Sequence, residues 1–422
     1  MIGRPLNRNK SIGISCMVFM AYVLFYMTGS NSEWHNYIQF ALFGLWNLFA
    51  LLGDPKSFRL AITSKPTIYL LFFLIYYFVT SIIEGELGYT LTYVGVYFMI
   101  YTCHVQFLYY YQRSRYKEVK FIVLTSLIGW CLIALFAIAF YTINPAAART
   151  LAADFTAYEN LYIGGGYAIA FGSAILFTYL TSLLLKRRLG VNKKTLVAFV
   201  VFILFYLIVK TESTTTLIAS VLGSMIGLFY EIRNNISKGR KIVLYIASIV
   251  LIAFLLNGGL VRVVYQISNS ASEELYAKRF DRIGEKLISF ESGSSNENYV
   301  DERWGLVVDS FNAFLDYPIF GVGYKVGNDY SRLSEYNVGT HSEICDSLAK
   351  YGVIGCFFFF GYFILSFKRT NRGIKNKSHL VTLFIMALMN PFQYFHGFYV
   401  LFVLIPFMNL LLIKSNHENV GK

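Results

Sequence analysis

His341 is the strongest candidate for chemistry in this chain, because it is an isolated histidine at the start of a segment with helical apolar spacing. Thr340 and Glu343 have the spacing of a capping box, which predicts that Thr340 caps a helix whose first residue is His341. The partial positive charge of a helix N-terminus disfavours imidazolium, and a general base requires the neutral imidazole. The alternative is an ordinary polar residue in a first turn. The side of this helix that we expect to be buried carries Ile344, Leu348 and Tyr351.

Two basic side chains are candidates for binding an anion beside the membrane. Arg303 opens the segment 302–316, and a guanidinium presents five donors in a fixed fork that can bind a phosphate through two hydrogen bonds. Its alternative is a surface arginine paired with neighbouring carboxylates or headgroups. Lys210 lies between two apolar runs and could meet an anionic headgroup. We favour a Lys210 that reaches the membrane surface or pairs with Glu212.

Gly321 and Gly323 follow Pro318, and they allow the backbone to turn sharply or to approach a ligand closely. A tight turn that returns the chain to a helix bundle is an equally good interpretation. The pair is not a nucleotide-binding fingerprint, because neither a strand–turn–helix context nor G-x-G-x-x-G spacing accompanies it.

These residues must be positioned by membrane helices. The chain of 422 residues is 56% hydrophobic and 14% charged, whereas soluble domains carry about 25% charged residues. Apolar runs of about 20 residues, enough to cross a bilayer, predict an all-α polytopic membrane protein with about twelve spans. The predicted spans are 11–29, 34–52, 67–83, 88–111, 119–143, 162–185, 194–210, 213–230, 241–258, 352–367, 378–393 and 396–413. Small residues predict tight helix contacts at Ala219, Gly223 and Gly227, and at Gly164, Ala168 and Gly172.

The distribution of Lys and Arg predicts the orientation. Basic residues gather in short segments that share one side of the membrane, whereas the long connection 259–351 is acidic on balance. The positive-inside rule therefore predicts cytoplasmic N- and C-termini and an extracytoplasmic 259–351 loop. The net charge of +13 is explained by this topology, so it does not indicate binding to nucleic acid.

We expect one membrane-embedded domain, 1–422, whose large outer loop carries the site. A loop as long as 259–351 is rarely structureless, so it should be folded or functional. Its pattern predicts short helices: an amphipathic one at 272–290 lying on the membrane, and one at 302–316 with a single apolar stripe.

Four short patterns follow one another in and just after this loop. They are Arg303-Trp304, Pro318-Ile-Phe-Gly321-Val-Gly323, His341-Ser342 and Gly352-Val-Ile-Gly355. The ordered set resembles the bacterial O-antigen polymerase and O-antigen ligase superfamily, which includes capsular and exopolysaccharide repeat-unit polymerases. The likeness covers residues 303–355, and the N-terminal half matches only as generic spans.

The resemblance implies a fold related to the C-type membrane glycosyltransferases. It implies an enzyme of the bacterial inner or plasma membrane that joins glycan units on the outer face without metal or cofactor. Donor and acceptor would be glycans linked to undecaprenyl pyrophosphate. His341 would activate the acceptor hydroxyl or stabilise the transition state, and Arg303 would bind the pyrophosphate. A flippase and a chain-length regulator would be partner proteins.

The chain departs from the family pattern in two places and contains one further spacing that some members share. The family usually has a second arginine in an S-R-[TG] motif, where this chain has Ser213-Thr214-Thr215; Lys210 or Arg149 would have to supply that charge. Ser342 stands where the family often has asparagine. The R-x10-G spacing of some polymerases occurs from Arg282 to Gly293, which makes Arg282 a further substrate-binding candidate, although chance produces this spacing easily.

The favoured activity is polymerisation of lipid-linked repeat units. A ligase that transfers glycan to a final acceptor is the closest alternative. A flippase or exporter of the lipid-linked unit would show paired repeats and interrupted spans in both halves, and the sequence has one asymmetric loop instead. A non-catalytic scaffold of an assembly complex stays open because the second family arginine is missing.

Overall fold

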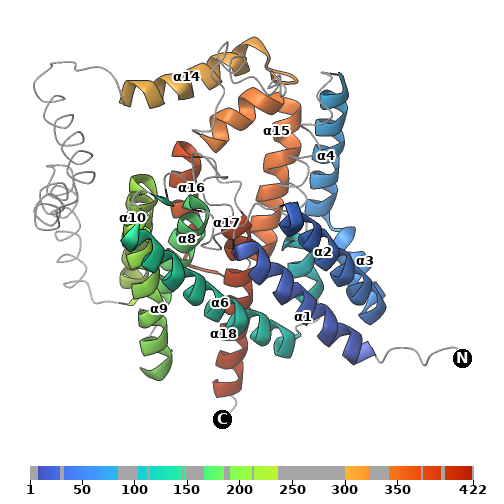
Figure 1. The fold of residues 1–422 in the computed structure, drawn as a ribbon, viewed down its shortest axis with the longest axis vertical. Coiled ribbons are helices and arrows are strands. Elements are labelled where there is room, and N and C mark those ends of the chain that lie inside the picture. Colours follow the sequence, from blue (N-terminus) through green and yellow to red (C-terminus); the bar gives the residue numbers. More distant parts are fainter. Residues whose placement is uncertain are drawn as a thin grey trace, which may run out of the picture. The chain divides into compact units, whose positions relative to one another are not determined.

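The structure is a computed structural model, and its regular elements are all helical in the part of the chain that it describes (Figure 1). This confirms the predicted all-α class. The described residues are 8–28, 33–83, 103–111, 115–144, 147–148, 166–184, 191–211, 213–235, 300–322, 342–371, 374–390 and 395–420.

The helices agree closely with the predicted apolar runs. Those described in the first part of the chain are α1 (Arg8–Met27), α2 (Glu33–Gly53), α3 (Pro55–Ile62), α4 (Lys65–Ile83), α6 (Tyr116–Ile143), α8 (Tyr167–Leu184), α9 (Val191–Lys210) and α10 (Thr214–Asn235). The later ones are α14 (Val300–Asp316), α15 (Glu343–Thr370), α16 (Ser378–Met389), α17 (Phe395–Tyr399), the π-helix η1 (Val400–Leu404) and α18 (Ile405–Val420). Residues 103–111 are also helical.

The chain divides into two compact units. One combines Met1–Leu228 with Leu306–Lys422, and the other is Phe229–Gly305. Most of the second unit, including the predicted surface helix 272–290 and the predicted span 241–258, lies outside the described residues. The predicted architecture of the loop 259–351 therefore stays a prediction.

Five of the described helices are long and apolar enough to cross a membrane. They are Asn9–Met27, Tyr116–Ile143, Tyr167–Leu184, Val191–Lys210 and Glu343–Thr370. A sixth would result if α3 and α4, which meet at a bend of 54°, form one broken span. The protein is thus a membrane protein, while the number of twelve spans stays a prediction.

Helix α3 differs from the sequence prediction, which treated residues 53–66 as a basic loop. Asp54 caps this helix by accepting a hydrogen bond from the Ser57 backbone N–H at 3.3 Å, and Pro55 occupies the first turn. Proline suits that position because its missing N–H would have no helical partner there. The charged residues of this segment indicated a loop, whereas the structure has a short helix there.

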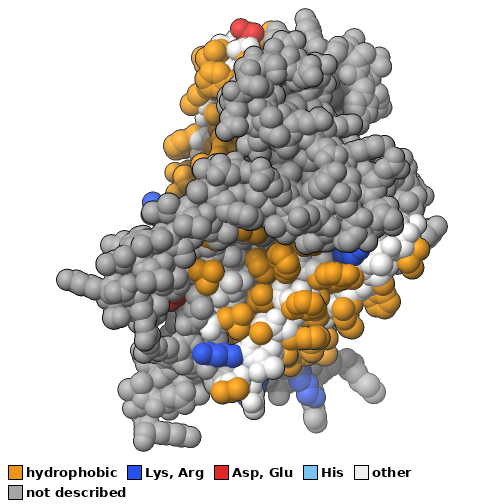
Figure 2. Space-filling model, turned by 90° about the vertical axis from the view of Figure 1, so that its left-hand side faces the viewer, with side chains coloured by type: hydrophobic (Ala, Val, Ile, Leu, Met, Phe, Trp, Pro, Cys, Tyr) orange, Lys and Arg blue, Asp and Glu red, His pale blue; other side chains and the backbone are white. Residues whose placement is uncertain are grey.

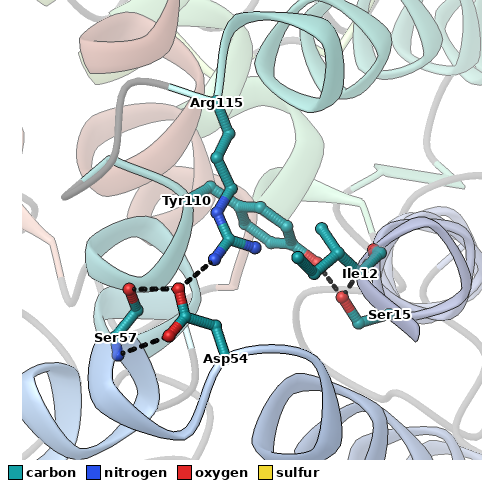
Figure 3. Close-up of polar contacts among 6 residues, drawn as sticks. All are labelled: Ile12, Ser15, Asp54, Ser57, Tyr110 and Arg115. Carbon is teal, nitrogen blue, oxygen red and sulfur yellow. Dashed lines mark hydrogen bonds and ion pairs between the residues drawn. The ribbon is translucent and has the colours of Figure 1, made fainter. Parts of the chain in front are cut away.

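Two predicted cytoplasmic connections are joined by an ion pair. The Arg115 guanidinium Nη2 lies 2.6 Å from Asp54 Oδ2, and both side chains are buried (Figure 3). The Arg115 guanidinium also lies 4.6 Å from the centre of the Tyr109 ring. Beside this pair, the Ser15 hydroxyl near the start of α1 lies 3.0 Å from the Tyr110 hydroxyl. The start of α1 and these two connections therefore lie on the same side of the bundle, as the charge pattern requires.

Helix α8 forms part of the core, and its small residues allow other helices to approach closely. It packs against α9, α16 and α17. A Cβ at Gly172 would lie 2.6 Å from the Trp130 ring. A Cβ at Gly223 of α10 would overlap the Thr382 hydroxyl of α16. These contacts confirm the predicted tight packing at Gly172 and Gly223, whereas Gly164 lies outside the described residues.

Figure 2 shows many hydrophobic side chains on the described part of one face. Independently of that view, the exposed hydrophobic side chains of the bundle include Ile75 and Val79 of α4, Phe136 of α6 and Phe202 of α9, which are 50%, 47%, 69% and 66% exposed. Such exposure would be costly in water, but lipid tails are as apolar as these side chains. The surface therefore agrees with a bilayer around the bundle.

Candidate functional site

Two of the sequence patterns meet in space. The turn at residues 317–322, which contains Gly321, packs against a break in α15 at Gly352. Gly352 has φ +56° and ψ −169°, a non-helical conformation inside an otherwise continuous helix. Gly321 also has a positive φ, +74°. We call this contact between residues 317–322 and residues 349–355 the glycine junction.

The glycine junction is an exchange of backbone hydrogen bonds. In an unbroken helix the Val353 N–H would donate to the Ala349 carbonyl, four residues earlier. Here the Val353 N–H donates to the Pro318 carbonyl at 2.8 Å, and the Ala349 carbonyl accepts from the Val322 N–H at 2.8 Å. A third bond, from the Ile354 N–H to the Ile319 carbonyl, measures 3.3 Å. The kink therefore leaves these buried polar groups paired with the turn.

Only glycine fits at three positions of the junction. A Cβ at Gly352 would lie 2.5 Å from both the Gly321 nitrogen and the Ile319 oxygen, and one at Gly321 would overlap the Lys350 carbonyl. A Cβ at Gly355 would lie 2.5 Å from the Tyr76 ring. The P-x-x-G-x-G and G-x-x-G patterns thus supply the glycines that allow the backbones of the turn and of α15 to come into direct contact.

Tyr76 of α4 binds both segments of the glycine junction through its hydroxyl, and the sequence did not indicate this residue. Its hydroxyl lies 2.7 Å from the Phe320 carbonyl oxygen and 2.8 Å from the Tyr351 carbonyl oxygen, and it donates to this pair of acceptors. The Tyr351 ring packs edge-on against Phe73, one helical turn before Tyr76, with ring centres 5.1 Å apart. Tyr76 is one of 33 tyrosines in the chain, so no local signal distinguished it.

The start of α15 differs from the prediction. The helix begins at Glu343 and its cap is Ser342, whose hydroxyl oxygen accepts from the Cys345 N–H at 3.3 Å. The predicted capping box of Thr340 and Glu343 is therefore wrong. Ser342 has the extended backbone of a cap, with φ −148° and ψ 113°. The Glu343 carboxylate, instead of reaching back, accepts from the Ser347 hydroxyl one turn ahead at 3.2 Å.

The buried side of α15 at its start is more polar than the spacing predicted. Tyr351 is buried as expected, but Ile344 and Leu348 are only partly buried. Glu343 and Asp346 are 2% and 5% exposed. Buried carboxylates need partners, so acidic side chains one or two turns from a membrane span point to a structural or catalytic task.

Asp346 connects α15 to α14. Its Oδ1 accepts a hydrogen bond from the Ser310 hydroxyl at 2.8 Å, and its Oδ2 accepts from the Ser342 N–H at 3.2 Å. Ser310 is fully buried, and so is Ala313, the next residue along the same side of α14, which packs near Ala349. The small, polar side of α14 is therefore the one that faces the protein.

The apolar stripe predicted for residues 302–316 faces outward. Val308, Phe311 and Leu315 are 40%, 47% and 57% exposed, and Ile319 and Phe320 in the following turn are 57% and 59% exposed. A helix that buries its small residues and exposes large apolar ones beside membrane spans is suited to the bilayer interface. The chain from α14 to the glycine junction thus lines a surface on which lipid can lie.

Residues 198–360 match the family model described as O-Antigen ligase. This match supports the O-antigen polymerase and ligase superfamily as the family that the chain resembles. This confirms the resemblance that the four patterns indicated, and the matched range contains α10, α14, the glycine junction and the outer half of α15. The family supports a glycosyltransferase-like activity of the O-antigen ligase or polymerase type. No curated protein matches the chain.

Of the candidate site residues predicted from the sequence, the structure describes three in part or in full. Gly321 lies in the glycine junction. Arg303 lies in the first turn of α14, and its side chain is outside the described atoms. Lys210 ends α9, with its ammonium 6.0 Å from the centre of the Tyr206 ring. His341, Gly323, Arg149 and Arg282 lie outside the described residues.

The described candidates belong to different groups of helices. The glycine junction is held by α4 and α15, whereas Lys210 ends α9, which packs against α6 and α8. The Tyr206 contact agrees with the interpretation that Lys210 extends along the membrane surface. Its role in substrate binding stays a prediction.

Proposed function

We propose that this protein polymerises undecaprenyl-pyrophosphate-linked oligosaccharide repeat units into a surface polysaccharide, such as O-antigen or capsule, on the outer face of the bacterial plasma or inner membrane. The observation that carries the proposal is the glycine junction, because it explains two family patterns as one structure. The junction holds the turn that follows α14 against α15.

The reaction needs little beyond positioning and charge. The acceptor hydroxyl oxygen attacks the anomeric carbon of the donor sugar and passes its proton to the His341 imidazole. The bond between that carbon and the pyrophosphate oxygen breaks, and the diphosphate leaves with both electrons. Arg303 binds the diphosphate oxygens through its fork and stabilises the charge that develops on them. Alignment of two lipid-linked substrates supplies the rest of the acceleration.

The surroundings suit a substrate with a lipid tail. The exposed apolar side chains of α14 and of the turn after it lie beside the spans α4 and α15. A polyprenyl chain in the bilayer could therefore lie along this surface while its headgroup remains outside. We assign Gly321 to the turn and not to a ligand contact, since its Cβ position is filled by the Lys350 carbonyl. Lys210, Arg149 and Arg282 remain candidates for the second cationic group.

Ligation of a finished glycan to a final acceptor is the second candidate, because the matching family model carries that description. Both reactions use the same kind of donor, and they differ in the acceptor. The proposed topology, with cytoplasmic termini, and the proposed partners, a flippase and a chain-length regulator, apply to either.

The test is the size distribution of lipid-linked and surface glycans in cells that lack the gene, complemented with wild type, His341→Ala or Arg303→Lys. A polymerase predicts single repeat units in the deletion strain and in both mutants, with long chains restored by wild type alone. Long chains stranded on the lipid carrier would establish the ligase. Repeat units trapped on the inner face would point to a transporter, and full-length polymer from His341→Ala would remove this histidine from the mechanism.

A further inference from the structure

We propose that Asp346 is a positioning residue for His341: its carboxylate fixes the peptide group that links His341 to Ser342 and ties that group to α14. The inference rests on the proposed function, because it assigns Asp346 a role in the same glycosyl transfer. It is carried by the buried contacts of Asp346, a residue that lies outside the four family patterns.

The first contact acts on the peptide group before α15. Asp346 Oδ2 accepts from the Ser342 N–H at 3.2 Å. This nitrogen belongs to the planar unit that also contains the carbonyl and the Cα of residue 341. Holding that plane restricts the direction in which the His341 side chain can leave the backbone. The Ser342 hydroxyl caps the same turn through the Cys345 N–H, so the residue after His341 is held by both its nitrogen and its side chain.

The second contact of Asp346 joins α15 to α14. Asp346 Oδ1 accepts from the Ser310 hydroxyl of α14 at 2.8 Å, and Ser310 is fully buried. One carboxylate therefore binds both α14, through Ser310, and the backbone N–H of Ser342, the residue that follows His341 in the chain. A hydrogen bond to a charged acceptor is about twice as strong as one between neutral groups. The glycine junction provides a further constraint at the other end of the same contact.

Loss of this carboxylate should lower turnover more than substrate binding. A misplacement of about 1 Å in a catalytic group can cost about 100-fold in rate. For Asp346→Ala we expect kcat to fall by about 10- to 100-fold, with little change in KM for the lipid-linked donor. Ser310→Ala removes the contact with α14 but keeps the one with the Ser342 N–H, so it should cause a smaller fall in kcat.

Asp346→Asn separates positioning from charge. Its amide oxygen can accept from the Ser342 N–H, and its amide nitrogen can donate to the Ser310 oxygen, because a hydroxyl both donates and accepts. We therefore expect Asp346→Asn to restore most of the activity that Asp346→Ala loses. Asp316→Ala is the matched control, since Asp316 is an exposed acid at the end of α14 and should leave kcat unchanged.

The experiment uses purified full-length protein in lipid nanodiscs with a lipid-linked repeat unit as substrate. Gel filtration confirms that each variant is folded, and deuterium exchange reports protection of the peptide that contains Ser342. Asp346→Ala with wild-type kcat, or Asp346→Asn as slow as Asp346→Ala, would overturn the inference. His341→Ala separates the two hypotheses: if it is inactive while Asp346→Ala is fully active, only this inference fails. If His341→Ala is active, the proposed mechanism fails as well.

Discussion

Gly352→Ala tests whether the glycine junction shapes the site. Gly352 has φ +56° and ψ −169°, a region that is almost exclusive to glycine. An alanine there would cost about 1–3 kcal/mol in backbone strain. Its Cβ would also lie 2.5 Å from two backbone atoms of the turn, Gly321 N and Ile319 O, which cannot rotate away as a flexible side chain can.

The turn can relieve this overlap only by moving away from α15. The Val353–Pro318 and Ile354–Ile319 hydrogen bonds would then lengthen or break, at about 1 kcal/mol each. The total is about 3–5 kcal/mol, a large part of the stability of a typical domain, about 5–15 kcal/mol. We expect Gly352→Ala to open the junction and to remove glycan polymer while much of the helix bundle stays folded.

The assay combines thermal unfolding of the purified protein, followed by gel filtration, with glycan length in complemented cells. Gly44→Ala is the control, because Gly44 lies in the middle of α2 and its Cβ would meet no atom within 4 Å. Alanine in a helix should be neutral there or stabilise by about 0.5–1 kcal/mol. If Gly352→Ala melted like wild type and made normal polymer, the argument from the junction would be refuted.

Three further predictions follow from side-chain contacts. Tyr76→Phe removes the hydroxyl that binds two junction carbonyls, so it should lower stability by about 1 kcal/mol and shorten the glycan, whereas wild-type melting would contradict this role. Arg115→Gln takes the guanidinium from buried Asp54 and should lower the free energy of unfolding by about 3–5 kcal/mol; adding Asp54→Asn should recover part of the loss in a thermal melt. Gly223→Ala should cost about 1–3 kcal/mol through overlap with the Thr382 hydroxyl, and Thr382→Ala in the same chain should rescue the yield of folded protein.

The sequence predicted the helices well because membrane spans are determined locally. An apolar run must be long enough to cross the bilayer and must satisfy its backbone internally, so hydropathy alone predicts helices such as α1, α6 and α9. The ordered motifs were also local, and the family match confirmed what they indicated. The exception is α3, where basic residues suggested a loop and a proline with an aspartate cap began a helix.

The architecture of the site depended on contacts that are remote in the sequence. Tyr76 and Tyr351 are 275 residues apart, and only folding shows that one hydroxyl serves both carbonyls of the junction. The capping pattern failed because Thr340 and Ser342 both have hydroxyls, and in the structure it is Ser342 that accepts from the Cys345 N–H and caps the helix. Spacing also predicted that Ile344 and Leu348 lie on the buried side of α15, whereas both are only partly buried.

The sequence by itself determined that this is a helical membrane protein that resembles the O-antigen polymerase and ligase superfamily, because length, hydropathy and short motifs are properties of contiguous residues. The tertiary structure decided what those motifs are for. It showed that Gly321 and Gly352 fit one backbone against another, that Ser342 begins α15 and that Asp346 joins this helix to α14. These features depend on burial and hydrogen bonding between segments that are distant in the sequence. The periodicity of residues along one segment carries no information about such contacts.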